Sequence, residues 1–279
     1  MKIGVFIFPT SRTIQPAELA QACEARNFDA LLLPEHTHIP AARTTPYPAG
    51  GELPAEYWTS HDPMIALAQA AVVTTKLKLG TGISLVVEHD PIVQAKQVAT
   101  LDALSSGRFL FGVGSGWNVE EMANHGTDFK QRWAVLEERV QAMKAIWQNT
   151  EASYAGKYVN FDRILQEPKP VQRPNPPILI GGSSKRALEC VARVGDGWMP
   201  IASRAGIAKG LPLLHQACER AGRDPKTLSL NAFMAPPVAG ELEKLAADGI
   251  ERAFFYLPSA PRDNVLGLLD QWAPLAKTW

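Results

Sequence analysis

An acid and two imidazole side chains stand directly after a short apolar run near the start of the chain. The run Leu31 to Leu33 stops at Pro34, and Glu35, His36 and His38 follow at once, before a proline-rich loop. Imidazole exchanges protons near neutral pH and is also a common metal ligand. These residue types therefore fit three kinds of site: a metal centre, a cofactor pocket in which protons move, or solvated loop positions.

A metal centre is the least favoured of these interpretations. The spacing His36-x-His38 resembles the opening ligand pair of metal-dependent amidohydrolases. Such a site needs further ligands, and the segments after the later apolar runs offer Gly, Ser, Trp, Pro and Ala instead. His61 and His89 each precede an aspartate–proline pair that fits a helix start. We expect no metal, and a metal-dependent hydrolase stays as an alternative.

Two glycine-rich segments have the composition of places where a ligand approaches the backbone. Gly181 to Ser184 (GGSS) precede a predicted helix, and glycines followed by free helix N–H groups suit a phosphate. An ordinary turn with a serine cap has the same composition. Gly112 to Asn118 (GVGSGWN) lack the full G-x-G-x-x-G spacing, so we expect no dinucleotide fold. Their three glycines indicate that a flat or bulky group passes close to the backbone.

Alternating apolar runs and amphipathic segments must position these residues. Eight runs indicate strands buried on both faces, each followed by a helical pattern: KIGVFIF, DALLLP, LKLGTGISLVV, RFLFGVG, PILIGG, DGWMPI, LSLNAFMAP and ERAFFYLP. Eight such units predict an α/β fold, the TIM (β/α)8 barrel, as a single domain over residues 1–279. A doubly wound sheet is the alternative. Residues 150–176 interrupt the period after the fourth helix, and we expect an inserted hairpin or loop there.

Composition excludes several classes of partner. The 279 residues carry a formal net charge of zero, so no basic surface indicates nucleic acid or an anionic membrane. No apolar run approaches the roughly 18 residues of a membrane span. Cys23, Cys190 and Cys218 have no zinc or redox spacing and suit a reducing compartment. We expect a cytoplasmic protein that acts on a small molecule.

The barrel places the polar segments together, because ligands bind at the C-terminal ends of TIM-barrel strands. The sequences PEHTHIP, LKLGTGISLVVEHDPIVQAKQVATLDALSSGRFLFGVGSGWNVEE and EPKPVQRPNPPILIGGSSKRALECVARVGDGWMP follow or contain such ends. With them the chain resembles the bacterial luciferase-like monooxygenase family, and most of all its branch that uses the deazaflavin coenzyme F420. The resemblance is strong over about residues 1 to 200.

The resemblance implies a flavin or deazaflavin across the strand ends. Its phosphate arm would lie at GGSS, and its ring against the third and fourth strands, where a non-proline cis peptide is expected at Gly82-Ile83. The implied cofactor-binding residues are His36, Gly82, Ile83, Ser84, Gly114, Ser115, Gly116, Trp117, Gly181, Gly182, Ser183 and Ser184.

The same resemblance gives His36 a role in the reaction. His36 would face the reactive ring centre and the substrate, and Glu35, the second candidate catalytic residue, or His38 would orient it or be solvated. Residues 39–60 would form a lid over the pocket. Sugar-phosphate dehydrogenases of the family carry a Glu where this chain has Trp117, which instead suits an apolar pocket. Glu120 and Glu121 fit a helix start better than a proton donor.

The expected activity is hydride transfer between coenzyme F420 and a small organic substrate. An FMN-dependent monooxygenase is the main alternative, and a deazaflavin carrier without turnover is another. The acidic tail of F420 requires cations beyond the phosphate loop, and the sequence offers Lys185, Arg186, Arg204 and Lys209. The family resemblance also implies a homodimer.

Overall fold

The computed structural model describes residues 1–202 and 206–279. Its eight parallel barrel strands close in the order β1-β10-β9-β8-β7-β4-β3-β2. The strands are β1 (Lys2–Phe6), β2 (Ala30–Leu33), β3 (Lys78–Thr81), β4 (Phe109–Val113), β7 (Ile178–Gly181), β8 (Gly197–Met199), β9 (Ser229–Phe233) and β10 (Arg252–Tyr256). The predicted α/β TIM barrel is confirmed, and the doubly wound sheet is not formed.

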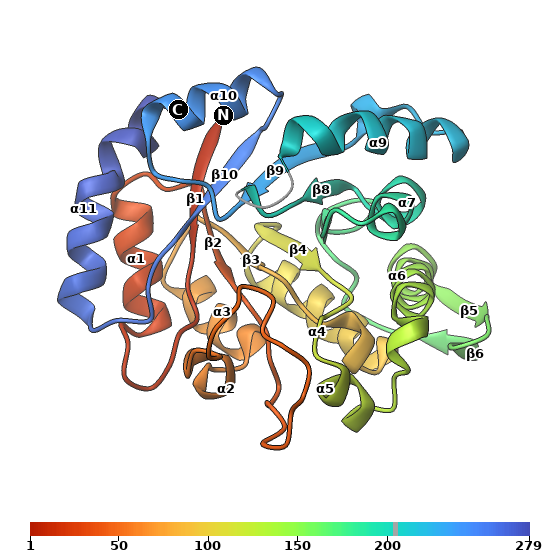
Figure 1. The fold of residues 1–279 in the computed structure, drawn as a ribbon. Coiled ribbons are helices and arrows are strands. Elements are labelled where there is room, and N and C mark those ends of the chain that lie inside the picture. The colour runs from red at the N-terminus through yellow and green to blue at the C-terminus, as the bar shows by residue number, and fades with distance from the viewer. Residues whose placement is uncertain (203–205) are drawn as a thin grey trace.

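Helices surround the strands (Figure 1). The described α-helices are α1 (Pro16–Ala25), α2 (Glu56–Thr59), α3 (Pro63–Val72), α4 (Pro91–Leu104), α5 (Val119–Asn124), α6 (Arg132–Gln148), α7 (Lys185–Val194), α9 (Ile207–Arg220), α10 (Ala239–Ala247) and α11 (Arg262–Thr278). None of the described helices is long and apolar enough to cross a membrane.

The continuous apolar runs reflect burial on both faces of each strand. Side chains alternate along a strand, so Leu32 points into the barrel while Leu31 and Leu33 pack toward the helices. The barrel interior also receives Phe6 and Phe254, which are buried. A strand with two buried faces cannot show the polar alternation of a half-exposed sheet, which is why the sequence pattern identified these strands.

Aspartate caps begin two of the helices where the sequence indicated. Asp62 accepts a hydrogen bond from the backbone N–H of Ile65 at the start of α3. Asp90 accepts hydrogen bonds from the N–H groups of Ile92 and Val93 at the start of α4. Such caps satisfy N–H groups that have no partner within the helix, and a proline follows each of them at the first helical position.

The interruption after α6 is a two-stranded antiparallel hairpin of β5 (Glu151–Ala155) and β6 (Asn160–Leu165). It lies outside the barrel beside α6, at the periphery of the molecule (Figure 1). The barrel itself is continuous behind it, because β4 pairs directly with β7. The predicted insertion is therefore confirmed as a hairpin followed by an irregular segment.

Candidate active site

A cavity of about 770 Å³ lies at the C-terminal ends of the barrel strands. Each strand contributes at least one wall residue at or just beyond its end: Phe6, Pro34, Gly82, Gly114, Gly181, Met199, Phe233 and Tyr256. Of the residues predicted from the sequence, ten line it: Glu35, His36, Gly82, Ile83, Gly114, Ser115, Gly116, Trp117, Gly181 and Gly182. The barrel thus brings together segments that are far apart in the chain.

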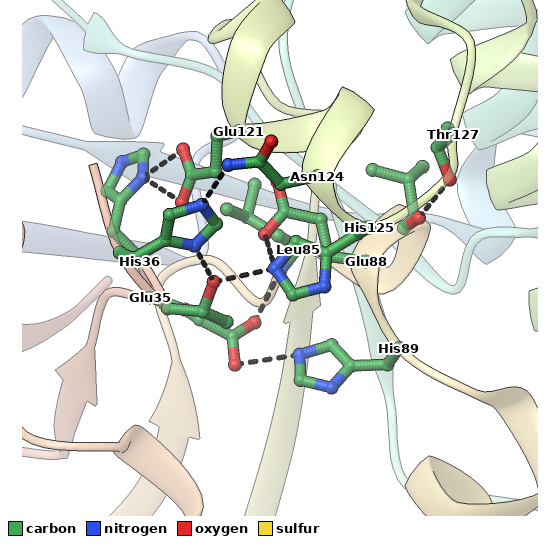
Figure 2. Close-up of polar contacts among 12 residues, drawn as sticks. Glu35, His36, Leu85, Glu88, His89, Glu121, Asn124, His125 and Thr127 are labelled. Atoms are coloured by element: carbon green, nitrogen blue, oxygen red, sulfur yellow. Dashed lines mark hydrogen bonds and ion pairs between the residues drawn. The ribbon is translucent and has the colours of Figure 1, made fainter. Parts of the chain in front are cut away.

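His36 is held by a carboxylate that the sequence did not connect with it. The two carboxylate oxygens of Glu121, on α5, lie 2.8 and 3.0 Å from His36 Nδ1 (Figure 2). Both side chains are nearly buried, at 7% and 1% exposure. A carboxylate only accepts hydrogen bonds, so Nδ1 carries the hydrogen. Nε2 is the ring nitrogen left for a molecule in the cavity.

Glu35 is engaged on the side away from His36. Its carboxylate accepts hydrogen bonds from Ser84 Oγ and the Leu85 N–H, and lies 2.9 Å from His89 Nε2 (Figure 2). Burial alone would raise the pKa of Glu35, but the hydrogen bonds and charge of His89 outweigh it and lower that pKa. With both oxygens engaged, Glu35 ties the end of β2 to the segment after β3.

Glu88 adds a third buried carboxyl group behind the cavity wall. Its Oε2 lies 3.6 Å from His125 Nε2 and has no hydrogen-bond partner among the described residues. Burial, followed by the carboxylates of Glu121 and Glu35, raises the pKa of Glu88 to about 9, against the opposing charge of Arg139. Glu88 is therefore uncharged at neutral pH, which avoids a third buried negative charge beside two others.

Replacing Glu88 with glutamine is expected to flatten the pH dependence of stability. In the unfolded chain Glu88 ionises near pH 4.5, whereas the folded protein keeps its proton up to about pH 9. Its contribution to stability is therefore complete below pH 4.5 and is lost as pH rises to about 9. In that window the free energy of unfolding of the wild type should fall, relative to Glu88→Gln, by about 1.4 kcal/mol per pH unit.

Urea unfolding at several pH values measures this difference. Glu243→Gln, which changes an exposed carboxylate on α10, is the matched control and should follow the wild type. Parallel curves for the wild type and Glu88→Gln would show that Glu88 ionises normally in the folded protein.

His38 does not line the cavity, and its ring contacts Thr37 and α5 instead. Its Nδ1 lies 2.9 Å from Thr37 Oγ1 and its Nε2 lies 2.9 Å from Asn124 Nδ2. Thr37 Oγ1 also lies 2.8 Å from His125 Nε2. Over residues 1–202 and 206–279, no group of three or more His, Cys, Asp or Glu side chains is arranged to hold a metal ion.

Gly112, within β4, and Gly114, just after it, pack closely against β3 and the segment that follows β3. A Cβ on Gly112 would lie 2.0 Å from the Thr81 carbonyl oxygen, and one on Gly114 would lie 2.6 Å from Ile83 Cδ1. These two glycines let the ends of the neighbouring strands approach each other, rather than only making room for a ligand. Gly181 has more space, with 3.4 Å to its nearest neighbour Ile83. The expected cis peptide at Gly82-Ile83 is present.

Three of the four serines predicted to bind the cofactor, Ser84, Ser183 and Ser184, do not line the cavity, whereas Ser115 does. Ser84 is buried and its hydroxyl donates to Glu35. Ser184 Oγ accepts from the Ala187 N–H and so caps α7. Ser183 precedes that cap, at the same end of the helix. The start of α7 therefore lies next to Gly181 and Gly182 at one end of the cavity, as the GGSS pattern indicated.

Two arginines lie near this helix start. The guanidinium of Arg132, at the start of α6, has an Nε without a hydrogen-bond partner among the described residues. Burial and then the charge of Arg186 lower the pKa of Arg132, so the two cations are close enough to repel each other. The adjacent Trp133 ring would contact a Cβ placed on Gly182 at 3.6 Å. A bound anion would relieve this repulsion. Arg204, also considered from the sequence, lies outside the described residues.

An aromatic cluster from the predicted lid covers the other end of the cavity. The ring centroid of Tyr57 lies 5.0 Å from that of His36. The hydroxyl groups of Tyr57 and Tyr47 lie 3.1 Å apart. Trp117 is 5.8 Å from His36 and 6.1 Å from Tyr47. All four side chains line the cavity. The sequence predicted the lid over residues 39–60 and the place of Trp117, but not the two tyrosines.

Glu120 and Glu121 lie in the first turn of α5, as predicted, but their carboxylates form hydrogen bonds with residues outside this helix. Glu121 holds His36, and Glu120 accepts hydrogen bonds from Thr44 and Thr45 of residues 39–60. Those hydrogen bonds lower the pKa of Glu120. The only sequence signal for these contacts was the position of both residues just after GSGWN.

The fold and this cavity can be compared with known proteins. The model of the luciferase-like monooxygenase family matches residues 1–272. The chain belongs to the luciferase-like monooxygenase family. An uncharacterised protein from Mycobacterium tuberculosis (strain ATCC 25618 / H37Rv) is 37% identical to this chain over 279 residues, covering 98% of each chain.

Other relatives of this luciferase-like chain differ in cofactor. An F420-dependent hydroxymycolic acid dehydrogenase of M. tuberculosis is 29% identical over 173 residues, covering 61% of this chain and 48% of its own. An FMNH2-dependent dimethylsulfone monooxygenase of Pseudomonas putida is 37% identical over 126 residues, covering 44% and 34%. The solved F420-dependent tetrahydromethanopterin reductase of Methanopyrus kandleri has the same fold, with a TM-score of 0.77, 16% identity and 97% coverage of both chains. The luciferase-like family thus includes both cofactor classes.

Proposed function

We propose that this protein transfers a hydride between coenzyme F420 and a small, apolar, uncharged organic substrate. The observation that carries the choice of cofactor is a second groove, which includes Lys185, the residue directly after the GGSS segment. This groove, of about 220 Å³, lies between α7 and α9, and its lining includes two cations, Lys185 and Arg220, beside Leu188, Leu213 and Gln216. In this proposal the acidic tail of F420 extends to these two cations, and FMN has no group that could use them. The F420-dependent relative supports the same choice.

The residues around the cavity fit a deazaflavin. The start of α7, with Gly182, Arg132 and Arg186 close by, would take the phosphate arm. Gly82, Ile83 and Gly114 would back the tricyclic ring. When bound, the cofactor supplies the hydride chemistry, and the chain supplies orientation and exclusion of water.

His36 is the side chain placed to move a proton at the substrate. Its Nδ1 is fixed by Glu121, so Nε2 is directed to the cavity, where it would exchange a hydrogen bond or a proton with a substrate oxygen. Tyr57 and Trp117 beside it would keep water away. Glu35, with both oxygens engaged, would keep the wall behind His36 in place.

The charge of the cavity wall supports the substrate class. Among the described residues, no lysine or arginine lines the cavity. Glu56 of α2 does line it, and its carboxylate accepts a hydrogen bond from Tyr256 Oη at 3.2 Å. A phosphorylated or carboxylated substrate would meet this negative charge without a cation to offset it. We therefore exclude sugar phosphates from the proposed substrates.

The cofactor proposal predicts the outcome of parallel calorimetric titrations. We expect coenzyme F420 to bind at least about tenfold more tightly than FMN, a difference of about 1.4 kcal/mol. The double variant Lys185→Ala/Arg220→Ala should weaken F420 by about tenfold and FMN by less than about twofold, because two charge contacts with the tail are lost. Lys277→Ala, an exposed cation on α11, is the control.

An FMN-dependent monooxygenase is the second candidate, favoured by the FMNH2-dependent relative. Tight binding of FMN, with F420 failing to compete, would move the protein to that class. Binding of F420 without turnover of any substrate would instead indicate a carrier.

We also propose that residues 1–279 form one domain and that the chain pairs as a homodimer. Exposed apolar side chains on the neighbouring helices α3 and α4 support pairing: Ile65, Val72, Val93 and Leu104. Each is at least 56% exposed, which is unusual for large aliphatic residues gathered on adjacent helices.

A further inference from the structure

Helix α5 contacts the lid and His36 through two consecutive carboxylates. Successive side chains on an α-helix are about 100° apart, so neighbours in sequence face different surroundings. Glu121 faces inward and its side chain is 1% exposed, whereas Glu120 faces residues 39–60. One turn of helix therefore touches both the segment over the cavity and the imidazole within it.

The inward contact leaves Glu121 and His36 dependent on each other. The Glu121 carboxylate has His36 Nδ1 as its hydrogen-bond partner among the described residues, at 2.8 and 3.0 Å. A buried carboxylate without a partner is costly, and so is a buried imidazole N–H without an acceptor. Either group therefore fixes the other, and the orientation of the His36 ring follows the position of α5.

The outward contact fastens the lid to the same helix. Glu120 accepts from the N–H groups of Thr44 and Thr45 at 2.8 and 3.1 Å, and from both threonine hydroxyls at 2.6 Å. Thr45 Oγ1 also accepts from the Val119 N–H at 3.3 Å. The Arg43 guanidinium lies over the Trp117 ring, 5.6 Å from its centroid. The lid is thus attached to α5 and to the residues just before it.

We propose that Glu121 is a positioning residue for His36, and that Glu120 couples its position to the lid. When residues 39–60 are attached to α5, the helix holds Glu121 against His36 and Nε2 is directed into the cavity. When the lid detaches, α5 loses its outer contacts and His36 loses its fixed orientation. The reacting side chain would be ordered only when the cavity is covered. This inference rests on the role proposed above for His36.

The test uses cofactor-free protein labelled with 15N-histidine. Its result therefore does not depend on which cofactor binds, and the coupling between the lid and His36 can fail or hold independently of the cofactor titration. In the wild type, the His36 15N shifts should report a hydrogen on Nδ1 that exchanges slowly with water. Glu121→Ala should abolish this signature, while Glu121→Gln, whose amide oxygen still accepts, should retain part of it. If Glu121→Ala fails to fold by circular dichroism, the Gln variant alone carries the comparison.

Coupling is tested with Glu120→Ala in the same samples. We expect amide hydrogen exchange across residues 39–60 to accelerate by about tenfold, and the His36 signals to broaden at the same time. Glu243→Ala on α10 is the control and should change neither readout. An unchanged His36 signature in the Glu121 variants would overturn the positioning role. Faster lid exchange with undisturbed His36 signals would overturn the coupling.

Discussion

Replacing His36 with alanine is expected to lower kcat by about 10²- to 10⁴-fold, which corresponds to roughly 3 to 5 kcal/mol of transition-state stabilisation. The imidazole lines the cavity, and its Nε2 has no hydrogen-bond partner among the described residues, while the proposed phosphate and ring contacts come from other residues. Coenzyme F420 should therefore bind His36→Ala with a Kd within about threefold of the wild type, because a contact made mainly in the transition state changes kcat and not ground-state binding.

The measurement is the absorbance change of F420 with a panel of apolar secondary alcohols, and of reduced F420 with the matching ketones. His215→Ala, which removes an exposed imidazole on α9, is the control and should retain wild-type rates. An equal loss of cofactor affinity would make His36 a ring-binding residue. Unchanged kinetics would return it to a solvated position.

Replacing Arg108 with alanine is expected to cost about 3 to 5 kcal/mol of stability. Its guanidinium is buried and donates to Ala71 O, Thr74 O, Thr74 Oγ1, Leu77 O and Ser105 O at 2.7–3.0 Å. Ala71 lies in the last turn of α3, and the other acceptors lie just after α3 or α4, where helices leave carbonyl groups unpaired. Removing Arg108 leaves several of them buried without a donor.

Thermal unfolding should show the loss as a fall in Tm of roughly 10 °C, and urea unfolding should show it without a change in slope. Arg163→Ala is the matched control, because Arg163 sits on the exposed hairpin in a surface pair with Glu151 and should cost less than about 1 kcal/mol. Arg108 is at the N-terminal ends of the strands, so cofactor affinity should not change. A loss below about 1 kcal/mol for Arg108→Ala would mean that water replaces the guanidinium.

The fold was predictable because its signals are local. Apolar runs such as Leu31 to Leu33 identify strands without reference to the rest of the chain, and Asp62 and Asp90 satisfy the N–H groups a few residues ahead of them. The eightfold alternation then leaves few ways to arrange the units. The short helix α2 was missed, since a segment of 4 residues carries too little periodicity to identify.

The site was predictable only as far as strand ends define it. His36, Trp117 and Gly181 were found because each follows or ends a strand. The partner of His36 was not found, since Glu121 is 85 residues away in sequence and only the closed barrel brings it near. For the same reason, Ser84 was expected at the cofactor, whereas its hydroxyl donates to Glu35, 49 residues before it.

The β5–β6 hairpin has a consequence for how such a chain can evolve. Because β4 bonds directly to β7, the chain leaves the barrel and returns to it between neighbouring strands. The length of the segment between β4 and β7 therefore does not affect how the barrel strands pair. Residues can be gained or lost there while the register of every strand around the cavity stays the same.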